Sequence, residues 1–247
     1  MLAEPADQQK LLNLADLDSE MGRLQHTARS LPQHQKIASL MAERQAVGES
    51  VIAATTEVDD LQVALRRAEA DLVPVRARLV RHRTRVEDGS ISDGKTLKGL
   101  IDEAARIERR IVELEEAEFE VMARLEDAET RTAELSGRRD EVETALRDEV
   151  GERDKQVGAL GNEAKGVAAA RKDIVKTVPP ALLSLYEKLR TQRGSGAAKL
   201  HRGQCTGCQL QITVADLDGF RKAPANEVLR CVECDRILVR TADSGLK

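Results

Sequence analysis

Glu87-Asp-Gly-Ser-Ile-Ser-Asp-Gly94 is the stretch that decides the fold of this chain. Its two glycines and four Ser or Asp residues indicate a turn, because these residue types tolerate turn conformations and bond the local backbone. On both sides, apolar residues recur in alternating steps of three and four, which is the spacing of a coiled-coil helix. The pattern predicts two long helical arms joined by a turn near residues 87–94.

Each arm carries a seam of such apolar residues. From Ile37 to Val86, thirteen of fifteen seam positions are apolar, and the exceptions are Arg44 and His82. The second arm repeats the pattern from Leu97 to Leu146. Residues 6–86 and 94–174 are equally long, so a hairpin would pair residue i with about 180 − i over roughly 120 Å. Two separate intermolecular coiled coils joined by a loop are the alternative, which equal arms around a turn make less favourable.

Both arms are weak at the same height of this hairpin. Pro32 lacks a backbone N–H and disfavours helix at Leu31, which predicts a kink or a short break. The second arm contains four glycines between Gly151 and Gly166, and each lowers helix propensity by up to about 1 kcal/mol. We expect a flexible or opened segment where these two stretches face each other.

All four cysteines lie near the C-terminus, in the pairs Cys205-Thr-Gly-Cys208 and Cys231-Val-Glu-Cys234, with 22 residues between them. Each pair points two thiolates at one centre, and two pairs complete a tetrahedral structural zinc site with Zn–S distances of roughly 2.3 Å. A disulfide pair and a thioredoxin-like redox motif are the alternatives. The spacing favours one structural Zn²⁺ held by these four cysteines.

These patterns predict a mainly α protein: a long antiparallel coiled-coil helical hairpin over residues 1–176, plus a small C-terminal β zinc ribbon over residues 195–247. Residues 177–194 form a short connecting helix and a linker, and the apolar face of that helix should dock on the base of the hairpin or on the ribbon. Alternating residues at 209–214 and 236–240 suit ribbon strands. A helical turn at 214–220 should cover the ribbon core with Leu217 and Phe220.

Composition restricts the class of protein. Charged residues make up 33% of the chain and aromatic residues 1%, which is typical of long coiled-coil helices rather than of a conventional globular core. The formal net charge of −4 does not by itself indicate a nucleic-acid-binding protein. The first residues lack a signal-peptide pattern, and no segment is apolar over the ~18 residues of a membrane span. With reduced cysteines, these features predict a cytoplasmic protein without membrane insertion.

Three motifs carry a resemblance to a known family: Ser92-Asp-Gly-Lys-Thr-Leu97, Val178-Pro-Pro-Ala-Leu-Leu-Ser-Leu-Tyr-Glu-Lys-Leu-Arg190, and the cysteine pairs with Cys234-Asp-Arg-Ile-Leu238. With them the chain resembles the bacterial coiled-coil hairpin proteins that have a C-terminal C4-type zinc ribbon. It departs from the family's pattern at Val232 and Asp235, where proline and glycine are common, and Asp should tolerate the left-handed backbone of the zinc knuckle. The resemblance implies non-enzymatic adaptor or chaperone-like factors that bind an RNA polymerase sigma factor, flagellar or secretion components and, in places, RNA.

Two groups of basic residues are candidate binding surfaces for a protein partner or a nucleic acid. The ribbon group is Lys199, Arg202, Arg221, Lys222, Arg230, Arg236 and Arg240, and the hairpin-tip group is Arg76, Arg78, Arg81, Arg83 and Arg85. Residues 76–98, which include Lys95 and Lys98, hold seven Lys or Arg against three Asp or Glu. A solvated helix face is the simpler interpretation of such a run, and phosphate or acidic-partner binding is the sharper one.

The leading functional hypothesis is a non-enzymatic interaction protein, a coiled-coil scaffold whose zinc-ribbon head docks protein partners. Direct binding of RNA or DNA through the ribbon and the basic tip is the alternative. Catalysis is disfavoured because a four-cysteine zinc shell has no open coordination position and no nucleotide-binding motif or acid/base constellation is evident. We therefore expect no small-molecule substrate, and the sequence leaves open whether the protein is a monomer or a dimer.

Overall fold

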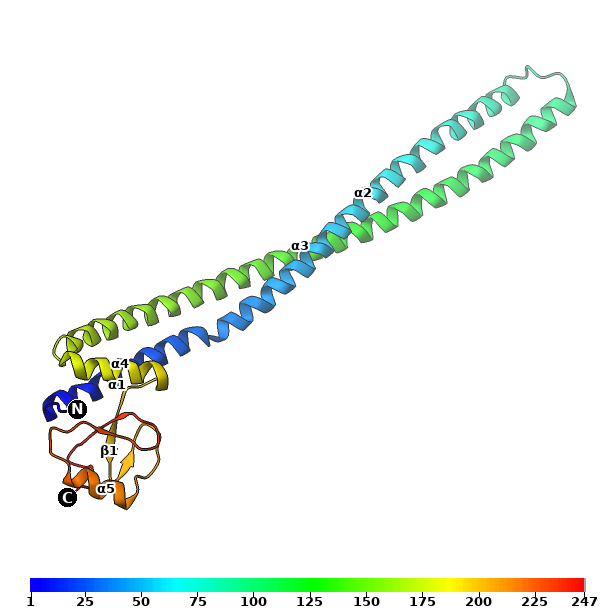
Figure 1. The fold of residues 1–247 in the computed structure, drawn as a ribbon. Coiled ribbons are helices and arrows are strands. Elements are labelled where there is room, and N and C mark those ends of the chain that lie inside the picture. The colour runs from blue at the N-terminus through cyan, green and yellow to red at the C-terminus, as the bar shows by residue number, and fades with distance from the viewer. Residues whose placement is uncertain (247) are drawn as a thin grey trace. The chain divides into compact units, whose positions relative to one another are not determined.

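The protein is mainly α-helical, with a small C-terminal sheet, as predicted (Figure 1). This computed structural model describes residues 1–246. The elements are α1 (Pro5–Arg29), α2 (Pro32–Glu87), α3 (Gly94–Val175), α4 (Pro180–Arg193), β1 (Ala197–His201), β2 (Gln204–Cys205), α5 (Val214–Lys222), β3 (Leu229–Arg230) and β4 (Ile237–Val239). The chain forms two compact units, one of residues 35–150 and one of residues 1–34 with the chain from Gly151 onward.

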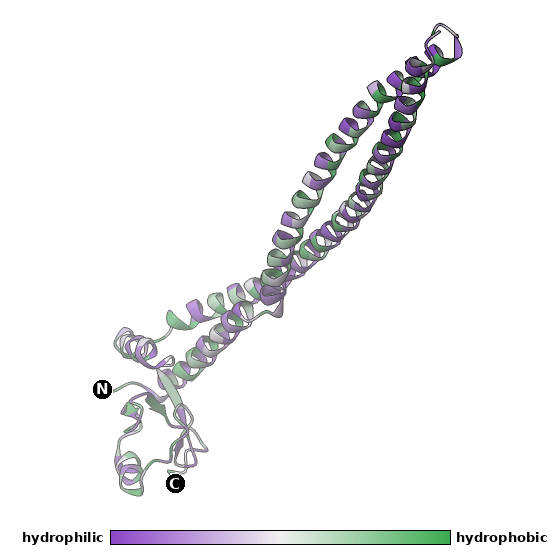
Figure 2. Cartoon of the chain, turned by 90° about the vertical axis from the view of Figure 1, so that its right-hand side faces the viewer, coloured by the Kyte–Doolittle hydropathy of each residue, from purple (hydrophilic) through white to green (hydrophobic). Residues whose placement is uncertain are grey.

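The unit of residues 35–150 is an antiparallel pair of helices, α2 and the first part of α3. Its buried apolar residues all occupy predicted seam positions: Ile37, Ala54, Leu61, Leu72 and Leu79 on α2, and Ile107, Ile111, Ala128 and Val142 on α3. Apolar residues recur among polar ones along both helices (Figure 2). The intramolecular hairpin is therefore confirmed, and its core is a narrow seam.

Ion pairs between α2 and α3 define the register of this hairpin. In six pairs, from Lys36–Glu149 near one end to Arg83–Glu108 near the turn, the two residue numbers add up to between 181 and 191. These sums are close to the predicted value of about 180, because each observed partner lies within about three helical turns of the predicted one. Long arginine side chains reach along the helices, which spreads the totals.

The turn between the arms has the chemistry that its residues predict. Gly89 adopts a left-handed backbone with φ of 67°. The Asp93 carboxylate accepts the N–H of Thr96 at 2.9 Å and that of Lys95 at 3.4 Å, so it satisfies the free donors at the start of α3. Hydrogen bonds from Thr96, first from its side chain, lower the pKa of Asp93.

The predicted short break at Pro32 is present on the first arm. α1 ends at Arg29, where the Ser30 N–H donates to the His26 carbonyl at 3.0 Å, and α2 begins at Pro32. On the second arm, α3 runs unbroken through Gly151–Gly166. The glycines therefore do not interrupt the helix, and a flexible or opened segment at this height stays a prediction.

In the other unit, α4 packs against both α1 and the sheet. Tyr186, Leu182 and Leu189 on one face of α4 share an apolar core with Leu14 of α1 and Ile237 of β4. Tyr186 is completely buried. The connecting helix thus joins the base of the arms to the ribbon, and the two docking partners proposed for it from sequence are both correct.

The sheet has the order β2-β1-β4-β3, in which β1 and β4 are parallel and the other pairs are antiparallel. Leu2 forms an additional bridge with Glu227 beside it. β4 confirms the predicted strand at 236–240, and α5 confirms the predicted helical segment at 214–220. Among the described residues, no helix combines the length and apolarity that a membrane crossing requires.

The predicted strand at 209–214 is wrong. Gln211 makes one isolated bridge with Gln204, and this segment contains no regular strand. Gln209 has a left-handed backbone with φ of 62°, which is incompatible with a strand. At the other end, the Thr213 hydroxyl accepts the Asp216 N–H at 3.2 Å and caps α5. The cysteine turn and the helix cap occupy the residues that the alternating pattern assigned to a strand.

Candidate functional site

Two tight turns present the four cysteines. In the first turn the Gln209 N–H donates to the Cys205 carbonyl at 2.8 Å, and in the second the Asp235 N–H donates to the Cys231 carbonyl at 2.9 Å. Gln209 and Asp235 both have left-handed backbones, with φ of 62° and 64°. Asp235 therefore takes the left-handed conformation that the sequence predicts for the zinc knuckle, which an aspartate tolerates.

The four sulfurs form one compact cluster. All four Sγ atoms lie within 4.8 Å of one another. Cys205 Sγ and Cys234 Sγ are 3.8 Å apart, and so are Cys208 Sγ and Cys231 Sγ. A tetrahedral ion with ligand distances of roughly 2.3 Å has sulfur–sulfur edges of about 3.8 Å. The cluster therefore has the dimensions of a four-thiolate metal site.

The distances between the sulfurs also argue against a disulfide and against a single redox motif. A disulfide requires an S–S distance of about 2.05 Å, and all four thiols are free. A single redox C-x-x-C motif does not describe them either, because both pairs converge on one centre. The cysteines could together hold a metal ion.

In the absence of a metal, the surroundings of the cysteines give their thiols different pKa values. Burial raises the pKa of Cys205 to about 12 and also raises the pKa of Cys231. Burial opposes ionisation of Cys234 as well, but hydrogen bonds, first from Arg236, lower its pKa to about 7. Four buried thiolates repel one another, so a bound cation is needed to keep all four deprotonated together at neutral pH.

A small apolar core holds the two cysteine turns in place. Buried residues from all parts of the sheet surround the sulfurs: Ala198, Leu200, Ile212, Leu229 and Leu238. Leu217 and Phe220 of α5 pack against this core, as predicted. In the first turn, a methyl group on Gly207 would lie 2.8 Å from Arg236 Cδ and 2.9 Å from Ala198 Cβ. Only glycine fits at Gly207 without displacing its neighbours.

Arg240, one of the candidate binding residues on the ribbon, serves the fold of the ribbon. Its guanidinium donates to the carbonyls of Ala223 at 3.0 Å, Pro224 at 2.6 Å and Glu227 at 2.8 Å. Burial lowers the pKa of Arg240. The side chain holds the loop between α5 and β3 against β4.

Arg236 and Arg230 also have partners within the head. The Arg236 guanidinium donates to the carbonyls of Arg193 at 2.6 Å and Ser195 at 3.1 Å, which joins the end of α4 to the second cysteine turn. Arg230 pairs with the carboxylate of Asp235. These contacts orient the cysteine turns and leave less of the two guanidinium groups free for a ligand.

Of the other candidate ribbon residues, Lys199 is half-buried, and Arg202, Arg221 and Lys222 are exposed. Lys199 lies 3.5 Å from the Asp243 carboxylate, and Arg221 pairs with Asp218. Arg202 has a left-handed backbone with φ of 49° and an exposed side chain, and Lys222 is exposed on α5. The role of these seven ribbon residues as a binding surface stays a prediction.

At the tip of the hairpin, three of the five arginines are ion-paired across the helices. Arg76 pairs with Glu115 at 2.6 Å, Arg78 with Glu103 at 2.7 Å, and Arg83 with Glu108 at 2.8 Å. Arg81 and Arg85 are exposed and form no ion pair with any described residue. When the range is extended to 76–115 to include the paired glutamates, it holds ten Lys or Arg against eight Asp or Glu. The net positive charge around the tip is therefore smaller than residues 76–98 alone indicate.

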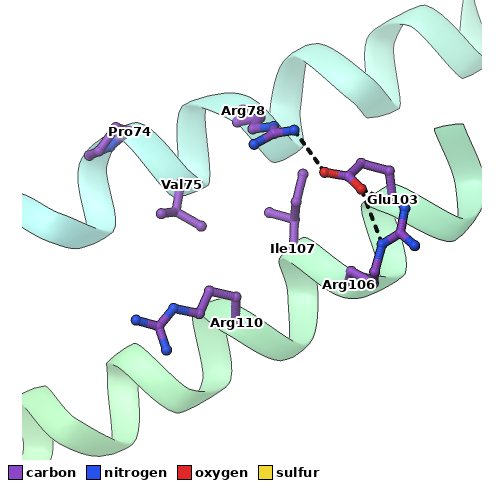
Figure 3. A pocket seen from close by; sticks show the side chains of 7 residues that line it. All are labelled: Pro74, Val75, Arg78, Glu103, Arg106, Ile107 and Arg110. Atoms are coloured by element: carbon purple, nitrogen blue, oxygen red, sulfur yellow. Dashed lines mark hydrogen bonds and ion pairs between the residues drawn. The ribbon is translucent and has the colours of Figure 1, made fainter.

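A groove between α2 and α3 lies close to these ion pairs (Figure 3). It has a volume of about 430 Å³, and its apolar wall includes Val75 and Ile107. Two of the arginines that line the groove share one carboxylate as their ion-pair partner, because Arg78 and Arg106 each lie 2.7 Å from Glu103. The Arg78 ion pair joins α2 to α3 beside the groove, and the third arginine that lines it, Arg110, lies 2.9 Å from Glu113.

Sequence reasoning missed Asp18 on α1, whose side chain is the most buried among the ion-paired residues that the structure describes. Its side chain is 5% exposed, and its carboxylate lies 2.7 Å from Arg171 Nε and accepts a 2.7 Å hydrogen bond from Tyr186 Oη. Arg171 and Arg190 both pair with Glu187 of α4. The signal was present, because Asp18 follows Leu11 and Leu14 by seven and four residues and so lies on the apolar face of α1.

Comparison with known proteins agrees with this architecture. Residues 14–194 match the model of the CT398-like coiled coil hairpin domain. The chain is 31% identical over 240 residues to the uncharacterized protein Rv2229c of Mycobacterium tuberculosis, covering 97% of this chain and 98% of that protein. A protein of Mycobacterium smegmatis has a similar solved structure, with a TM-score of 0.83, 30% identity, and coverage of 97% of this chain and 100% of that one.

A more distant solved structure shows the same fold. CT398 of Chlamydia trachomatis aligns with a TM-score of 0.68 at 18% identity, over 96% of this chain and 98% of its own. The match to the hairpin model covers most of the arms and α4, and the four-cysteine cluster follows it directly in the chain. The protein belongs to the family of CT398-like coiled-coil hairpin proteins.

Proposed function

We propose that this protein is a non-enzymatic adaptor, a coiled-coil scaffold that docks protein partners and in which one structural zinc ion holds the four-cysteine head. The sulfur geometry carries the proposal, because four thiolates at tetrahedral spacing leave no coordination position for water or a substrate. An all-thiolate tetrahedral donor set suits zinc better than oxygen-preferring cations such as magnesium or calcium.

The other charged groups support a structural rather than a catalytic role. The buried carboxylate of Asp18 accepts a hydrogen bond from Tyr186 and pairs with Arg171, and these contacts connect α1, α3 and α4. The family resemblance favours a protein partner from transcription or secretion machinery, with a sigma factor as the first candidate. The expected site of action is the cytoplasm.

Metal analysis and chelation test the zinc part of the proposal. We expect one zinc ion per chain by elemental mass spectrometry, and loss of that ion in Cys205→Ser and Cys231→Ser variants. Chelation should unfold the head, because metal binding supplies much of the folding free energy of so small a unit. Hydrogen exchange should accelerate in residues 197–246 and stay slow near Ile107 and Ile111. Unchanged exchange in the head after complete zinc removal would contradict a structural site.

Cross-linking followed by mass spectrometry in the soluble extract of the native cell tests the adaptor part. We expect one or a few proteins to be enriched reproducibly over a control with an unrelated coiled coil. Hydrolytic or transferase activity that is lost with Cys205→Ser would instead support an enzyme.

Direct nucleic-acid binding is a second candidate, favoured by the free guanidinium groups of Arg81 and Arg85 and the nearby exposed Lys95 and Lys98. Because the protein has few aromatic side chains for base stacking, such binding should be electrostatic and strongly dependent on salt. Gel shifts of RNA and DNA at low salt test it. The shift should vanish in the Arg81→Glu/Arg85→Glu variant and persist in a matched Arg109→Glu/Arg124→Glu control.

A further inference from the structure

A second apolar stripe runs along α3 on the side that faces solvent. Ile101, Val112, Phe119 and Met122 are 50%, 52%, 73% and 49% exposed. At about 100° per residue, the first three point in directions within about 20° of one another. This direction is about a third of a turn from the seam of Ile107 and Ile111, so the stripe is separate from the core of the hairpin.

Phe119 is the prominent feature of this stripe. It is one of only two phenylalanines in the chain, and the hairpin core does not use it. Shallow hollows flank it on both sides, one lined by Val112 and Glu116 and the other by Leu65 of α2 and Met122. An exposed ring between two hollows offers a partner side chain an anchor and two places to pack.

The charged residues around the stripe are predominantly acidic. Residues 111–130 hold eight Asp or Glu and one Arg, and residues 55–74 of α2, which lie opposite in the register of the ion pairs, hold five Asp or Glu and two Arg. Glu116, Glu120 and Glu126 are exposed and form no ion pair with a described residue. A partner that covers Phe119 must therefore bring positive charge.

We propose that the α3 face centred on Phe119 is a docking surface for a basic amphipathic helix of a partner protein. The partner's apolar residues pack around the Phe119 ring, and Lys or Arg residues along the edges of its helix pair with Glu116 and Glu126. This proposal rests on the adaptor function above and adds to it the surface used and the chemistry of the partner.

Charge complementarity distinguishes this occupant from a second copy of the chain. Two copies joined through this face would bring two strongly acidic segments together, which is unfavourable at moderate ionic strength. A helix with an apolar stripe and basic edges gains both from burial of the Phe119 ring and from the surrounding carboxylates.

A designed peptide tests the surface directly. The probe is a fluorescein-labelled helical peptide of about 18 residues, with leucines along one face and lysines along its edges, titrated into the full-length protein and followed by anisotropy. We expect Phe119→Ala to weaken binding about 10-fold or more. Glu116→Lys/Glu126→Lys should weaken it to a similar extent and reduce its salt dependence. A peptide with glutamates in place of the lysines should not bind.

Matched variants separate this surface from general attraction to an acidic rod. Ile52→Ala removes a side chain that is 70% exposed on α2, and Glu134→Lys/Asp148→Lys makes the same change in charge elsewhere on α3. Both should bind like the unaltered protein. A photo-cross-linking residue should capture the peptide from position 119 and not from position 52. Equal affinity of the Phe119→Ala and unaltered proteins would overturn the proposal, and so would failure of the lysine peptide to bind or dimerisation through this face in light scattering.

The same variants separate failure of this proposal from failure of the adaptor function. If a cellular partner is captured and its binding does not depend on Phe119 or Glu116, the docking surface is wrong and the adaptor function stands. If no partner is captured by the unaltered protein, the adaptor function itself fails.

Discussion

Tyr186 on α4 donates a hydrogen bond of 2.7 Å to the carboxylate of Asp18 on α1, across 168 residues of sequence. Asp18 also lies 2.7 Å from Arg171 on α3. This one carboxylate therefore connects three helices, α1, α3 and α4.

Replacing Asp18 with alanine should destabilise the unit of residues 1–34 and 151–246 by about 1–3 kcal/mol, because the buried Tyr186 hydroxyl loses its acceptor and Arg171 keeps only Glu187 as a carboxylate partner. Denaturant unfolding followed by the fluorescence of Tyr186, the only tyrosine, measures the effect in a chain without tryptophan. The neighbouring exposed Asp16→Ala variant is the control and should unfold like the unaltered protein. A similar midpoint for both variants would show that the network contributes little.

Stability of the same unit should fall in strong alkali. Burial, followed by the hydrogen bond with Asp18, raises the pKa of Tyr186 in the folded protein. In the unfolded chain the phenol ionises near pH 10, so the stabilisation is fully present below about pH 10 and is lost as the pH rises above it. The ultraviolet absorbance of tyrosinate, from the only tyrosine, should therefore rise together with unfolding. A titration near pH 10 in a chain that stays folded would contradict this, and Tyr186→Phe should remove the dependence.

Gly207→Ala should weaken metal binding and destabilise the head by about 1–3 kcal/mol, because its methyl group would overlap Arg236 and Ala198 and force the first cysteine turn to move. Gly219→Ala is the matched control on exposed α5, where a Cβ meets nothing within 4 Å, and it should stabilise slightly. Competition with a chromophoric zinc chelator gives the relative affinities. Equal zinc retention by the two variants would be inconsistent with a close-packed turn.

Arg240→Ala should lower the stability of the head by about 1.5–3 kcal/mol, because three loop carbonyls lose a charged donor. Arg240→Lys should recover only part of this loss, since an ammonium group lacks the planar fork of guanidinium. Thermal unfolding of both variants, with Lys222→Ala as a control of equal charge change, measures it. If Arg240→Ala is as stable as Lys222→Ala and loses only partner binding, the ribbon arginine is a binding residue after all.

Local chemistry explains what could be predicted along the arms. The side chains buried in residues 35–150 all lie on the seam that the three–four spacing marks, because a helix repeats its faces every 3.6 residues. The loop at 87–94 follows equally from its glycines and short polar side chains. α1 ends before Pro32 and α2 begins at it, because proline disfavours helix at the residue before it.

Local hydrogen bonds explain the one wrong strand prediction. The alternating residues from Gln209 to Val214 have strand periodicity, but the cysteine turn imposes a left-handed Gln209 and the Thr213 cap begins a helix. The arginines of the tip and the ribbon have the pattern of a binding surface, which stays a prediction, and the structure adds that Arg78 pairs with Glu103 and that Arg240 donates to loop carbonyls. No local pattern shows which partner a long side chain reaches.

The sequence by itself determined the helical hairpin, the turn between the arms and the identity of the four cysteines as one site, because helical periodicity, glycine tolerance and C-x-x-C spacing act over a few neighbouring residues. Only the tertiary structure decided that Asp18 is buried beneath Tyr186, that most candidate basic residues are paired within the chain, and that Phe119 stays in solvent. Burial and charge pairing depend on which segments come together in space: Asp18 meets Tyr186 across 168 residues, and Arg78 of α2 meets Glu103 of α3. Such contacts are outside the reach of any local rule.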